Sequence, residues 1–280
     1  MCILLFGGSG LLGSHLFNFF YERNIFSVKL GYRNNCDKKV NLGNVDEVFS
    51  AIKKYKPSTI INCAANVDVD ACNSNLKKAL EKNYFYVKNI VDSLQKSKAH
   101  PQFVHISTDQ LYNNKNNLSS NKENQININN NYSISKYLGE KYASKYSRSL
   151  ILRTNFFGKS LLKHRKSYSD WIIENIKDNK KIYVNRNIYF NPLHISTLCE
   201  IINKLIINRV YGIYNVASKD GISKYKFALR IVNKFFLNKK FILFRDKLNN
   251  RPKGTIMNVS KIEKKLKIIM PTVSQSLDLL

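Results

Sequence analysis

The sequence of 280 residues predicts an α/β fold in which a doubly wound parallel sheet carries a smaller, interleaved α/β lobe. Short apolar runs alternate with helical patterns through roughly the first 150 residues, as repeated βαβ units do. A glycine-rich turn joins the first apolar run to the first helical pattern. After Gly158 the pattern changes to shorter helices and isolated strands, which is typical of an added lobe.

Five strands are expected in the first part of the chain, because each is a short apolar run of the kind that a parallel sheet buries on both faces. They are residues 2–6, 26–30, 59–62, 103–106 and 150–152. The segments between them place apolar side chains on one helical face, as Leu12, Leu16 and Phe20 do. These helices are expected at residues 11–21, 45–52, 76–94 and 132–146. Right-handed crossovers would then place helices on both faces of the sheet.

The later part of the chain predicts a smaller lobe. Isolated strands are expected at residues 182–184, 189–190 and 213–216. The division expected is a sheet domain of residues 1–155, to which residues 191–217 return, and a lobe formed by residues 156–190 and 218–280. The asparagine-rich segment 113–131 is interpreted either as an exposed loop or as a lid over a substrate.

Composition excludes several classes of protein. Hydrophobic residues make up 44% of the chain, so a disordered protein is excluded, and no apolar run reaches the roughly 18 residues of a membrane span. The first apolar run ends in the glycine turn, so no signal peptide is expected. The cysteines are odd in number, scattered and without CxxC spacing, which predicts reduced thiols in the cytoplasm. They are Cys2, Cys36, Cys63, Cys72 and Cys199.

The net charge of +27 raises the question of a nucleic-acid partner. Lysine, asparagine and isoleucine are enriched together, as the codons of an A/T-rich genome would cause. The lysines are spread along the chain, and no RNA-recognition, zinc or helix-turn-helix signature is present. We therefore expect no nucleic-acid partner and no membrane partner, while the basic surface favours an anionic small substrate.

Three glycines shape the turn after the first strand. Gly7, Gly10 and Gly13 fit the pattern GxxGxxG at the start of a helix. Glycines at this spacing allow a tight turn and let the backbone approach a pyrophosphate, whose charge lies at the helix N-terminus. The turn therefore predicts a Rossmann fold that binds NAD(P).

The end of the second strand favours NADPH, with NADH possible. A protein that uses NAD usually carries an acidic residue here for the ribose 2′-hydroxyl. This sequence instead reads Lys29-Leu30-Gly31-Tyr32-Arg33. Arg33 could pair with a 2′-phosphate, stack on the adenine, or be one more surface cation.

A Tyr-x-x-x-Lys pair, Tyr132 and Lys136, opens the helix that follows the loop after the fourth strand. The spacing places both side chains on one face of the helix. An adjacent ammonium lowers the pKa of a phenol, which makes the tyrosine a better acid at neutral pH. Thr108, in the segment Ser-Thr-Asp after the fourth strand, would hold the substrate oxygen near the phenol.

The same spacing occurs at Tyr84 with Lys88 and at Tyr137 with Lys141, as expected where both residue types are common. Position separates the three pairs. Only Tyr132 both opens a helix and follows a strand-end Ser-Thr-Asp.

These motifs resemble the extended short-chain dehydrogenase/reductases, and within that group most closely the dTDP-4-dehydrorhamnose reductase family. The resemblance covers nearly the whole chain. It is carried by residues 3–13, 61–68, 107–109, 132–136, 139–140, 152–155, 191–194, 212–217 and 251–252. It implies NAD(P)H-dependent reduction of a nucleotide-linked 4-keto-6-deoxy sugar for surface polysaccharide synthesis, with hydride reaching C4 and Tyr132 donating the proton. A homodimer is possible.

The resemblance, with Arg33 from the second strand and Trp171 and Arg251 as candidates from the later lobe, gives expected roles for individual residues. The cofactor-binding set would be Gly7, Ser9, Gly10, Leu11, Leu12, Arg33, Asn41, Leu42, Cys63, Ala64, Ala65, Tyr132, Lys136 and Asn155. The substrate would be contacted by Val67, Asp68, Thr108, Asp109, Gln110, Tyr132, Asn155, Trp171 and Arg251. The catalytic residues would be Thr108, Tyr132 and Lys136.

Some positions depart from the family pattern. Asn41 stands where relatives usually have Asp, His15 replaces an acid that some relatives carry, and no metal site is expected. Gln110 cannot exchange the proton that a 4,6-dehydratase must move, which disfavours that activity. A nucleotide-sugar epimerase and a non-catalytic, NADP-binding regulatory subunit remain as alternatives.

Overall fold

The computed structural model describes residues 2–32, 35–114, 120–163, 165–245 and 251–280. Arg33, expected near the adenosine half of the cofactor, lies outside these residues. Contacts within the chain divide it into two compact units. Unit 1 comprises Met1–Thr108, Asn130–Arg153 and Ile201–Tyr214, and unit 2 comprises Asp109–Asn129, Thr154–Glu200 and Asn215–Leu280.

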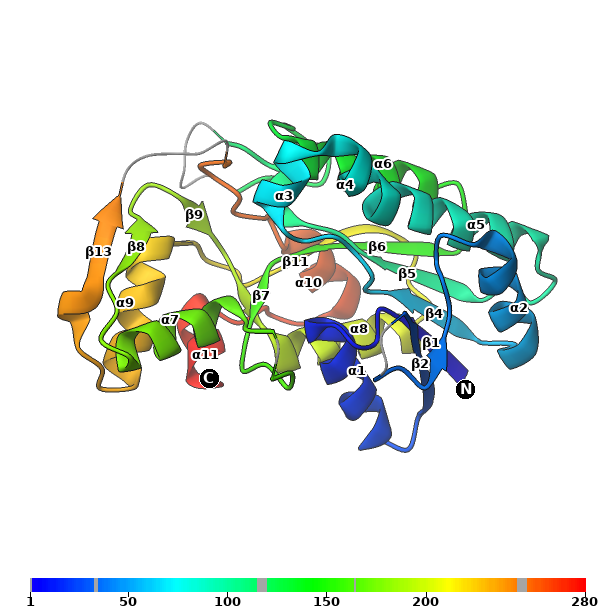
Figure 1. Cartoon of the computed structure of the whole chain (residues 1–280), viewed down its shortest axis with the longest axis horizontal. Coiled ribbons are helices and arrows are strands. Elements are labelled where there is room, and N and C mark those ends of the chain that lie inside the picture. The colour runs from blue at the N-terminus through cyan, green and yellow to red at the C-terminus, as the bar shows by residue number, and fades with distance from the viewer. Residues whose placement is uncertain (1, 33–34, 115–119, 164, 246–250) are drawn as a thin grey trace. The chain divides into compact units, whose positions relative to one another are not determined.

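A seven-stranded sheet of the described residues, in the order β11-β6-β5-β4-β1-β2-β3, forms the centre of unit 1 (Figure 1). Its strands are β1 (Cys2–Phe6), β2 (Phe26–Gly31), β3 (Lys38–Lys39), β4 (Thr59–Asn62), β5 (Gln102–Ile106), β6 (Ser149–Thr154) and β11 (Gly212–Val216). The five pairs from β3 to β6 are parallel, and Phe6 is in register with Leu30 and Asn62. The carboxyl ends of these strands therefore meet at one edge, where α/β sheets bind ligands.

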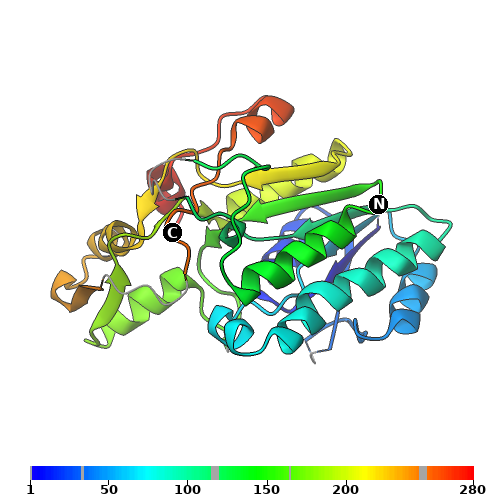
Figure 2. The same ribbon diagram turned by 90° about the horizontal axis from the view of Figure 1, so that it is seen from above.

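Helices cover both faces of this sheet, as the doubly wound prediction requires. On one face α5 packs against both α2 and α6, and on the other lie α1 and the C-terminal half of α8 (Figures 1 and 2). The bounds are α1 (Leu11–Tyr21), α2 (Val45–Tyr55), α3 (Val69–Ser74), α4 (Leu76–Leu80), α5 (Tyr86–Lys96), α6 (Asn131–Ala143) and α8 (Ile195–Ile207). The predicted Rossmann-like α/β class is thus confirmed.

The core of unit 1 forms where the inner face of these helices meets the strands. Phe6 of β1, Val48 and Ile52 of α2, and Ile90 and Leu94 of α5 are all completely buried. Apolar side chains on one stripe of each helix provide the main free energy of packing.

Unit 2 has its own core and short paired strands. Its elements are β7 (Phe156–Phe157), α7 (Tyr168–Lys177), β8 (Ile182–Asn185), β9 (Tyr189–Phe190), β10 (Leu193–His194), β12 (Ile222–Ser223), α9 (Lys224–Lys234), β13 (Ile242–Arg245), α10 (Ser260–Leu266) and α11 (Val273–Asp278). The core packs α7 and α9 around Phe157, Phe190 and Phe227. Phe190 and Phe227 meet edge to face, with ring centroids 5.3 Å apart.

Several local features differ from the sequence expectation, among them the unexpected short strand β3. The helix expected at 76–94 contains a π-helical segment, Glu81–Phe85, between α4 and α5. The helix expected at 45–52 continues to Tyr55. In the asparagine-rich segment, Asn121 is buried and donates a hydrogen bond from Nδ2 to the carbonyl of Ile256 at 2.8 Å. Among the described residues, no helix is long and apolar enough to cross a membrane.

Candidate active site

The glycine turn follows β1 and leads into α1. Gly7 has φ of +73°, and a Cβ atom there would lie 2.6 Å from the backbone nitrogen of Ala64. A Cβ atom on Gly13 would collide with the carbonyl oxygen of Gly7. Helix α1 begins after Gly10, and no side chain caps its first N–H groups. The turn thus leaves a backbone cradle with free donors, which suits a phosphate group.

The segment after β4 lies directly against this turn. Cys63 donates its N–H to the carbonyl of Phe6 at 2.8 Å, which continues the sheet by one residue. The side chain of Asn62 accepts a hydrogen bond from the N–H of Ala64 at 3.0 Å, and its amide lies 3.4 Å from Nδ1 of His105. The structure therefore brings Cys63 and Ala64, both predicted cofactor contacts, to the glycine turn.

Tyr132 lies in the first turn of α6. The helix begins after Asn130, whose side chain accepts a hydrogen bond from the N–H of Ser133 at 2.8 Å. Tyr132 is buried in a small cluster with Val69, Cys72 and Ala79. Local capping and this packing fix the position of the phenol-bearing residue.

Lys136 lies one turn farther along α6 and reaches the end of β5. Its Nζ donates a hydrogen bond to the carbonyl of Ile106 at 2.8 Å. Thr108 follows Ile106 by two residues and is buried, so the predicted catalytic threonine belongs to the segment that Lys136 contacts. Burial lowers the pKa of Lys136 to about 8, and the carboxylate of Glu140 opposes that shift.

Burial also shifts the pKa values of two groups near Lys136, the thiol of Cys63 and the imidazole of His105. Burial raises the pKa of Cys63 to about 12, which the charge of Lys136 partly opposes. Burial, helped by Lys136, holds the pKa of His105 well below its ordinary value. Cys63 and His105 are therefore a neutral thiol and a neutral imidazole near pH 7.

Asn83 connects the segment after β4 to α6, and sequence reasoning missed it. Its Oδ1 accepts a hydrogen bond from the N–H of Asn66 at 2.8 Å, and its Nδ2 donates to the carbonyl of Asn66 and to Oγ of Ser135, each at 3.0 Å. Asn83 belongs to the π-helical segment, a feature that often marks functional sites. The sequence signal for it was weak, because an asparagine inside a helical pattern has many explanations.

Unit 2 contains a polar pocket around the side chains of Asp109 and Asn155. Oδ2 of Asp109 accepts hydrogen bonds from Nδ2 of Asn155 at 2.7 Å and from Oγ1 of Thr255 at 2.8 Å. The complete lining is Asp109, Gln110, Asn155, Ile188, Phe190, Lys224, Arg251, Pro252 and Thr255. Four predicted substrate contacts thus meet in one pocket, together with Lys224 and Thr255, which the sequence analysis did not identify.

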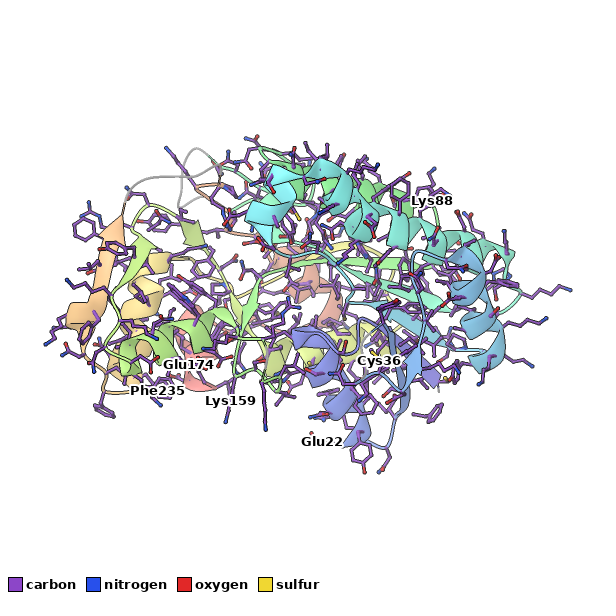
Figure 3. The ribbon with its side chains drawn as sticks, in the orientation of Figure 1. Glu22, Cys36, Lys88, Lys159, Glu174 and Phe235 are labelled. Atoms are coloured by element: carbon purple, nitrogen blue, oxygen red, sulfur yellow. The ribbon has the colours of Figure 1, made fainter. Side chains whose placement is uncertain are left out.

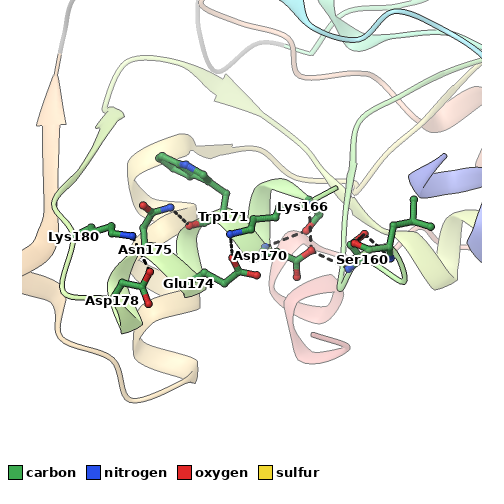
Figure 4. Close-up of polar contacts among 10 residues, drawn as sticks. Ser160, Lys166, Asp170, Trp171, Glu174, Asn175, Asp178 and Lys180 are labelled. Atoms are coloured by element: carbon green, nitrogen blue, oxygen red, sulfur yellow. Dashed lines mark hydrogen bonds and ion pairs between the residues drawn. The ribbon is translucent and has the colours of Figure 1, made fainter. Parts of the chain in front are cut away.

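Trp171, also a predicted substrate contact, lies on α7 (Figure 4). It is not among the residues that line that pocket. Its ring stacks on Tyr168 with centroids 5.9 Å apart, and its carbonyl accepts a hydrogen bond from Asn175 at 2.7 Å. The helix begins with a capping box of Ser167 and Asp170, and Asp170 also accepts from the N–H of Ser160 at 2.9 Å.

The remaining predicted contacts lie in the loops of unit 1. Val67 is 48% exposed, whereas Asp68 caps α3 by accepting a hydrogen bond from the N–H of Ala71 at 3.0 Å. Asn41 donates its N–H to Glu47 at 2.8 Å, and Leu42 is buried. Among the described residues, no three His, Cys, Asp or Glu side chains are grouped as a metal site would require.

Known proteins resemble this chain over most of its length. Spore coat polysaccharide biosynthesis protein SpsK of Bacillus subtilis (strain 168) is 25% identical over 232 residues, covering 82% of this chain and 78% of SpsK. The dTDP-4-dehydrorhamnose reductase of Aggregatibacter actinomycetemcomitans is 26% identical over 241 residues, covering 82% of this chain and 77% of that protein.

The fold is also that of a solved structure. The dTDP-4-dehydrorhamnose reductase from Bacillus anthracis str. Ames in complex with NADP matches with a TM-score of 0.88 and 22% identity, covering 99% of this chain and 97% of that one. The family model described as RmlD substrate binding domain matches residues 1–280. With the glycine turn and the Tyr132–Lys136 pair at the carboxyl edge of its sheet, the chain belongs to the RmlD substrate binding domain family.

Proposed function

We propose that this protein is an NADPH-dependent reductase of a nucleotide-linked 4-keto-6-deoxy sugar, acting in surface polysaccharide synthesis. The observation that carries the proposal is the contact of Lys136 with the end of β5, which sets a buried Tyr-x-x-x-Lys pair beside the strand that leads to Thr108. The names of two relatives, a dTDP-4-dehydrorhamnose reductase and a spore coat polysaccharide protein, support the substrate class and the pathway.

The residues of the glycine turn fit a dinucleotide. A Cβ atom on Gly7 or Gly13 would fill the cradle, and the first N–H groups of α1 have no side-chain cap. The pyrophosphate would be held by residues 7–12, and Cys63, Ala64 and Ala65 would line the cofactor. The relative from Bacillus anthracis, solved with NADP, supports the choice of NADPH, while NADH remains an alternative.

Tyr132 is the proton donor in this proposal. NADPH, held by the glycine turn and the segment after β4, would supply the hydride for the C4 carbonyl carbon. The Tyr132 phenol gives its proton to the carbonyl oxygen, so that the ketone becomes a secondary alcohol. Thr108 orients that oxygen, and the Lys136 ammonium stabilises the phenolate that remains.

The unit 2 pocket supplies substrate contacts. Asp109 and Asn155 are already joined by a hydrogen bond of 2.7 Å and present polar atoms suited to sugar hydroxyls. Lys224 and Arg251 add positive charge to the same lining, which suits the diphosphate of a nucleotide sugar. The substrate is therefore an anion with several hydroxyl groups.

The test mixes purified protein with NADPH and dTDP-4-keto-6-deoxyglucose and follows absorbance at the nicotinamide band. We expect oxidation that Tyr132→Phe abolishes and that Tyr137→Phe, the matched control with the same Tyr-x-x-x-Lys spacing, retains. Calorimetry of NADPH binding separates the negative outcomes. Binding without turnover of any keto-sugar would favour a regulatory subunit, and absence of binding would overturn the cofactor site itself.

A further inference from the structure

A buried carboxylate lies on the same helical face as Lys136. Glu140 follows Lys136 by four residues on α6, so one turn separates them. Glu140 is 2% exposed and Lys136 is 3% exposed. Burying two charged groups costs a large free energy of desolvation unless each is paired or hydrogen-bonded.

Arg153 of β6 holds that carboxylate. Nε of Arg153 donates to Oε1 of Glu140 at 2.9 Å, and Nη2 donates to Oε2 at 2.6 Å. The guanidinium is 1% exposed, so the pair is closed off from water. Such a two-point contact fixes the direction of the carboxylate as well as its charge.

Several other ionisable groups face Lys136. They are Cys63 after β4, Cys72 on α3, His105 on β5 and Tyr132 on α6. Burial raises the pKa of both thiols and lowers the pKa of His105, so these three groups are neutral near pH 7. The nearby charge that favours the ammonium form of Lys136 therefore belongs to Glu140.

We propose that Glu140, fixed by Arg153, is a positioning residue that keeps the buried Lys136 side chain in its ammonium form. Glu140 touches neither substrate nor cofactor in this scheme and acts only through Lys136. The effect of Glu140 on catalysis rests on the proposed function, in which the ammonium form of Lys136, and not the neutral amine, stabilises the Tyr132 phenolate. A purely structural ion pair between α6 and β6 would leave the titration of Lys136 unchanged.

The experiment measures that titration directly. Protein labelled with [ε-13C]lysine is followed by NMR between pH 6.5 and 10.5, and the Lys136 resonance is assigned by its loss in Lys136→Met. We expect a midpoint near pH 8 in the wild type and one lower by about one pH unit in Glu140→Gln, the size expected for a unit charge one helical turn away. No turnover is needed, so the result stands whether or not the reductase proposal holds.

A matched control removes a different carboxylate that contacts the same helix. Asp92 on α5 pairs with Lys88 at 2.5 Å and accepts a hydrogen bond from Tyr142 of α6 at 2.7 Å. Lys88 lies on the outer side of α5 (Figure 3). Asp92→Asn should leave the Lys136 midpoint unchanged.

A second variant covers the case in which Glu140→Gln fails to fold because Arg153 is left with a buried charge. The double variant Glu140→Leu/Arg153→Met replaces the whole pair with apolar groups of similar size. Because it removes the positive charge of Arg153 together with the carboxylate, its midpoint should also lie below that of the wild type, but by less than in Glu140→Gln. If the double variant folds and titrates like the wild type, the proposal is overturned. If the midpoint falls and the enzyme is active, the apparent pKa of the alkaline limb of the kcat/KM profile should fall by a similar number of pH units.

Discussion

Asn83 donates a hydrogen bond to Ser135, whose hydroxyl in turn donates to the backbone carbonyl of Tyr132 at 2.8 Å. The same Asn83 side chain holds both the N–H and the carbonyl of Asn66. It therefore ties the segment after β4 to the first turn of α6. The π-helical turn at Glu81–Phe85 is closely packed here, since a Cβ atom on Gly139 of α6 would collide with the carbonyl oxygen of Asn83.

Asn83→Ala should lower the free energy of unfolding by about 2–4 kcal/mol. The change removes three hydrogen bonds and leaves buried partners unsatisfied. Urea unfolding measures the loss. Asn208→Ala is the control, because Asn208 is exposed just after the end of α8 and its side chain donates a hydrogen bond to the carbonyl of Lys204 in the last turn of that helix, so the change should alter stability by less than about 0.5 kcal/mol. Equal effects of the two changes would refute the connecting role.

Gly7→Ala should abolish NADPH binding and destabilise unit 1 by about 2–3 kcal/mol. The φ of +73° is strained for alanine, and the new methyl group would press on the backbone at Ala64. Calorimetric titration with NADPH and thermal unfolding give the two readouts. Gly43→Ala is the matched control for stability, since the nearest atoms to its Cβ atom would belong to the side chains of Asn41 and Tyr86, at 3.1 Å or more, and it should keep near-wild-type stability. A Gly7→Ala protein with wild-type affinity for NADPH would exclude the turn as the pyrophosphate site.

The sequence predicts the central sheet well, because buried parallel strands are uninterrupted apolar runs. Strands β1 and β4 and helix α1 begin and end at the predicted residues. The π-helical segment was not foreseen, since it depends on a shift of backbone hydrogen bonds that leaves the apolar periodicity intact. Helix α3 is only six residues long, too short for a periodic signal.

Candidate site residues in local motifs could likewise be predicted from the sequence, whereas those held by long-range contacts could not. Gly7, Tyr132 and Lys136 lie in local motifs whose spacing is visible in the chain. Thr255 donates a hydrogen bond to Asp109 although 146 residues of sequence separate them, and no local sequence pattern predicts that contact. Asn121 belongs to the polar segment interpreted as an exposed loop or a lid, but it is buried and donates a long-range hydrogen bond to Ile256.

Lys136→Met should stabilise the protein near neutral pH while abolishing the proposed activity. The folded-state pKa of about 8 lies below the ordinary 10.5, so below pH 8 the lysine is charged in both states and the cost of burying the ammonium is fully present. The variant removes that cost and also loses the hydrogen bond to Ile106, which is the smaller contribution. The free energy of unfolding at pH 7 should therefore rise by about 1–2 kcal/mol.

This gain should depend on pH. Between about pH 8 and pH 10.5 the unfolded wild type binds the proton that the folded protein has lost, so the stability of the wild type rises relative to that of the variant. Urea unfolding at pH 6.5, 8 and 10 measures the difference. Lys88→Met, which removes a lysine from a half-exposed ion pair, should show no stabilisation at any of these pH values. A destabilised Lys136→Met at pH 6.5 would mean that burial costs less than the lost hydrogen bond.

Lys224→Met should raise KM for the nucleotide sugar by about 10- to 100-fold and leave the affinity for NADPH unchanged. Lys224 lines the unit 2 pocket, where its Nζ lies 5.6 Å from the ring centroid of Tyr168, and loss of a charge-assisted contact to a diphosphate has about this magnitude. Salt screens exposed charges, so the difference between wild type and variant should narrow as ionic strength rises.

The control for this prediction is Lys226→Met, two residues farther along α9, because Lys226 is exposed and does not line the pocket. It removes the same unit of charge from the same helix, so a general effect of net charge would appear equally in both variants. Steady-state kinetics at two salt concentrations, with calorimetry for NADPH, separate the cases. Matching KM values for the two variants would show that the unit 2 pocket does not bind the diphosphate, whereas a rise confined to Lys224→Met would assign the anionic part of the substrate to it.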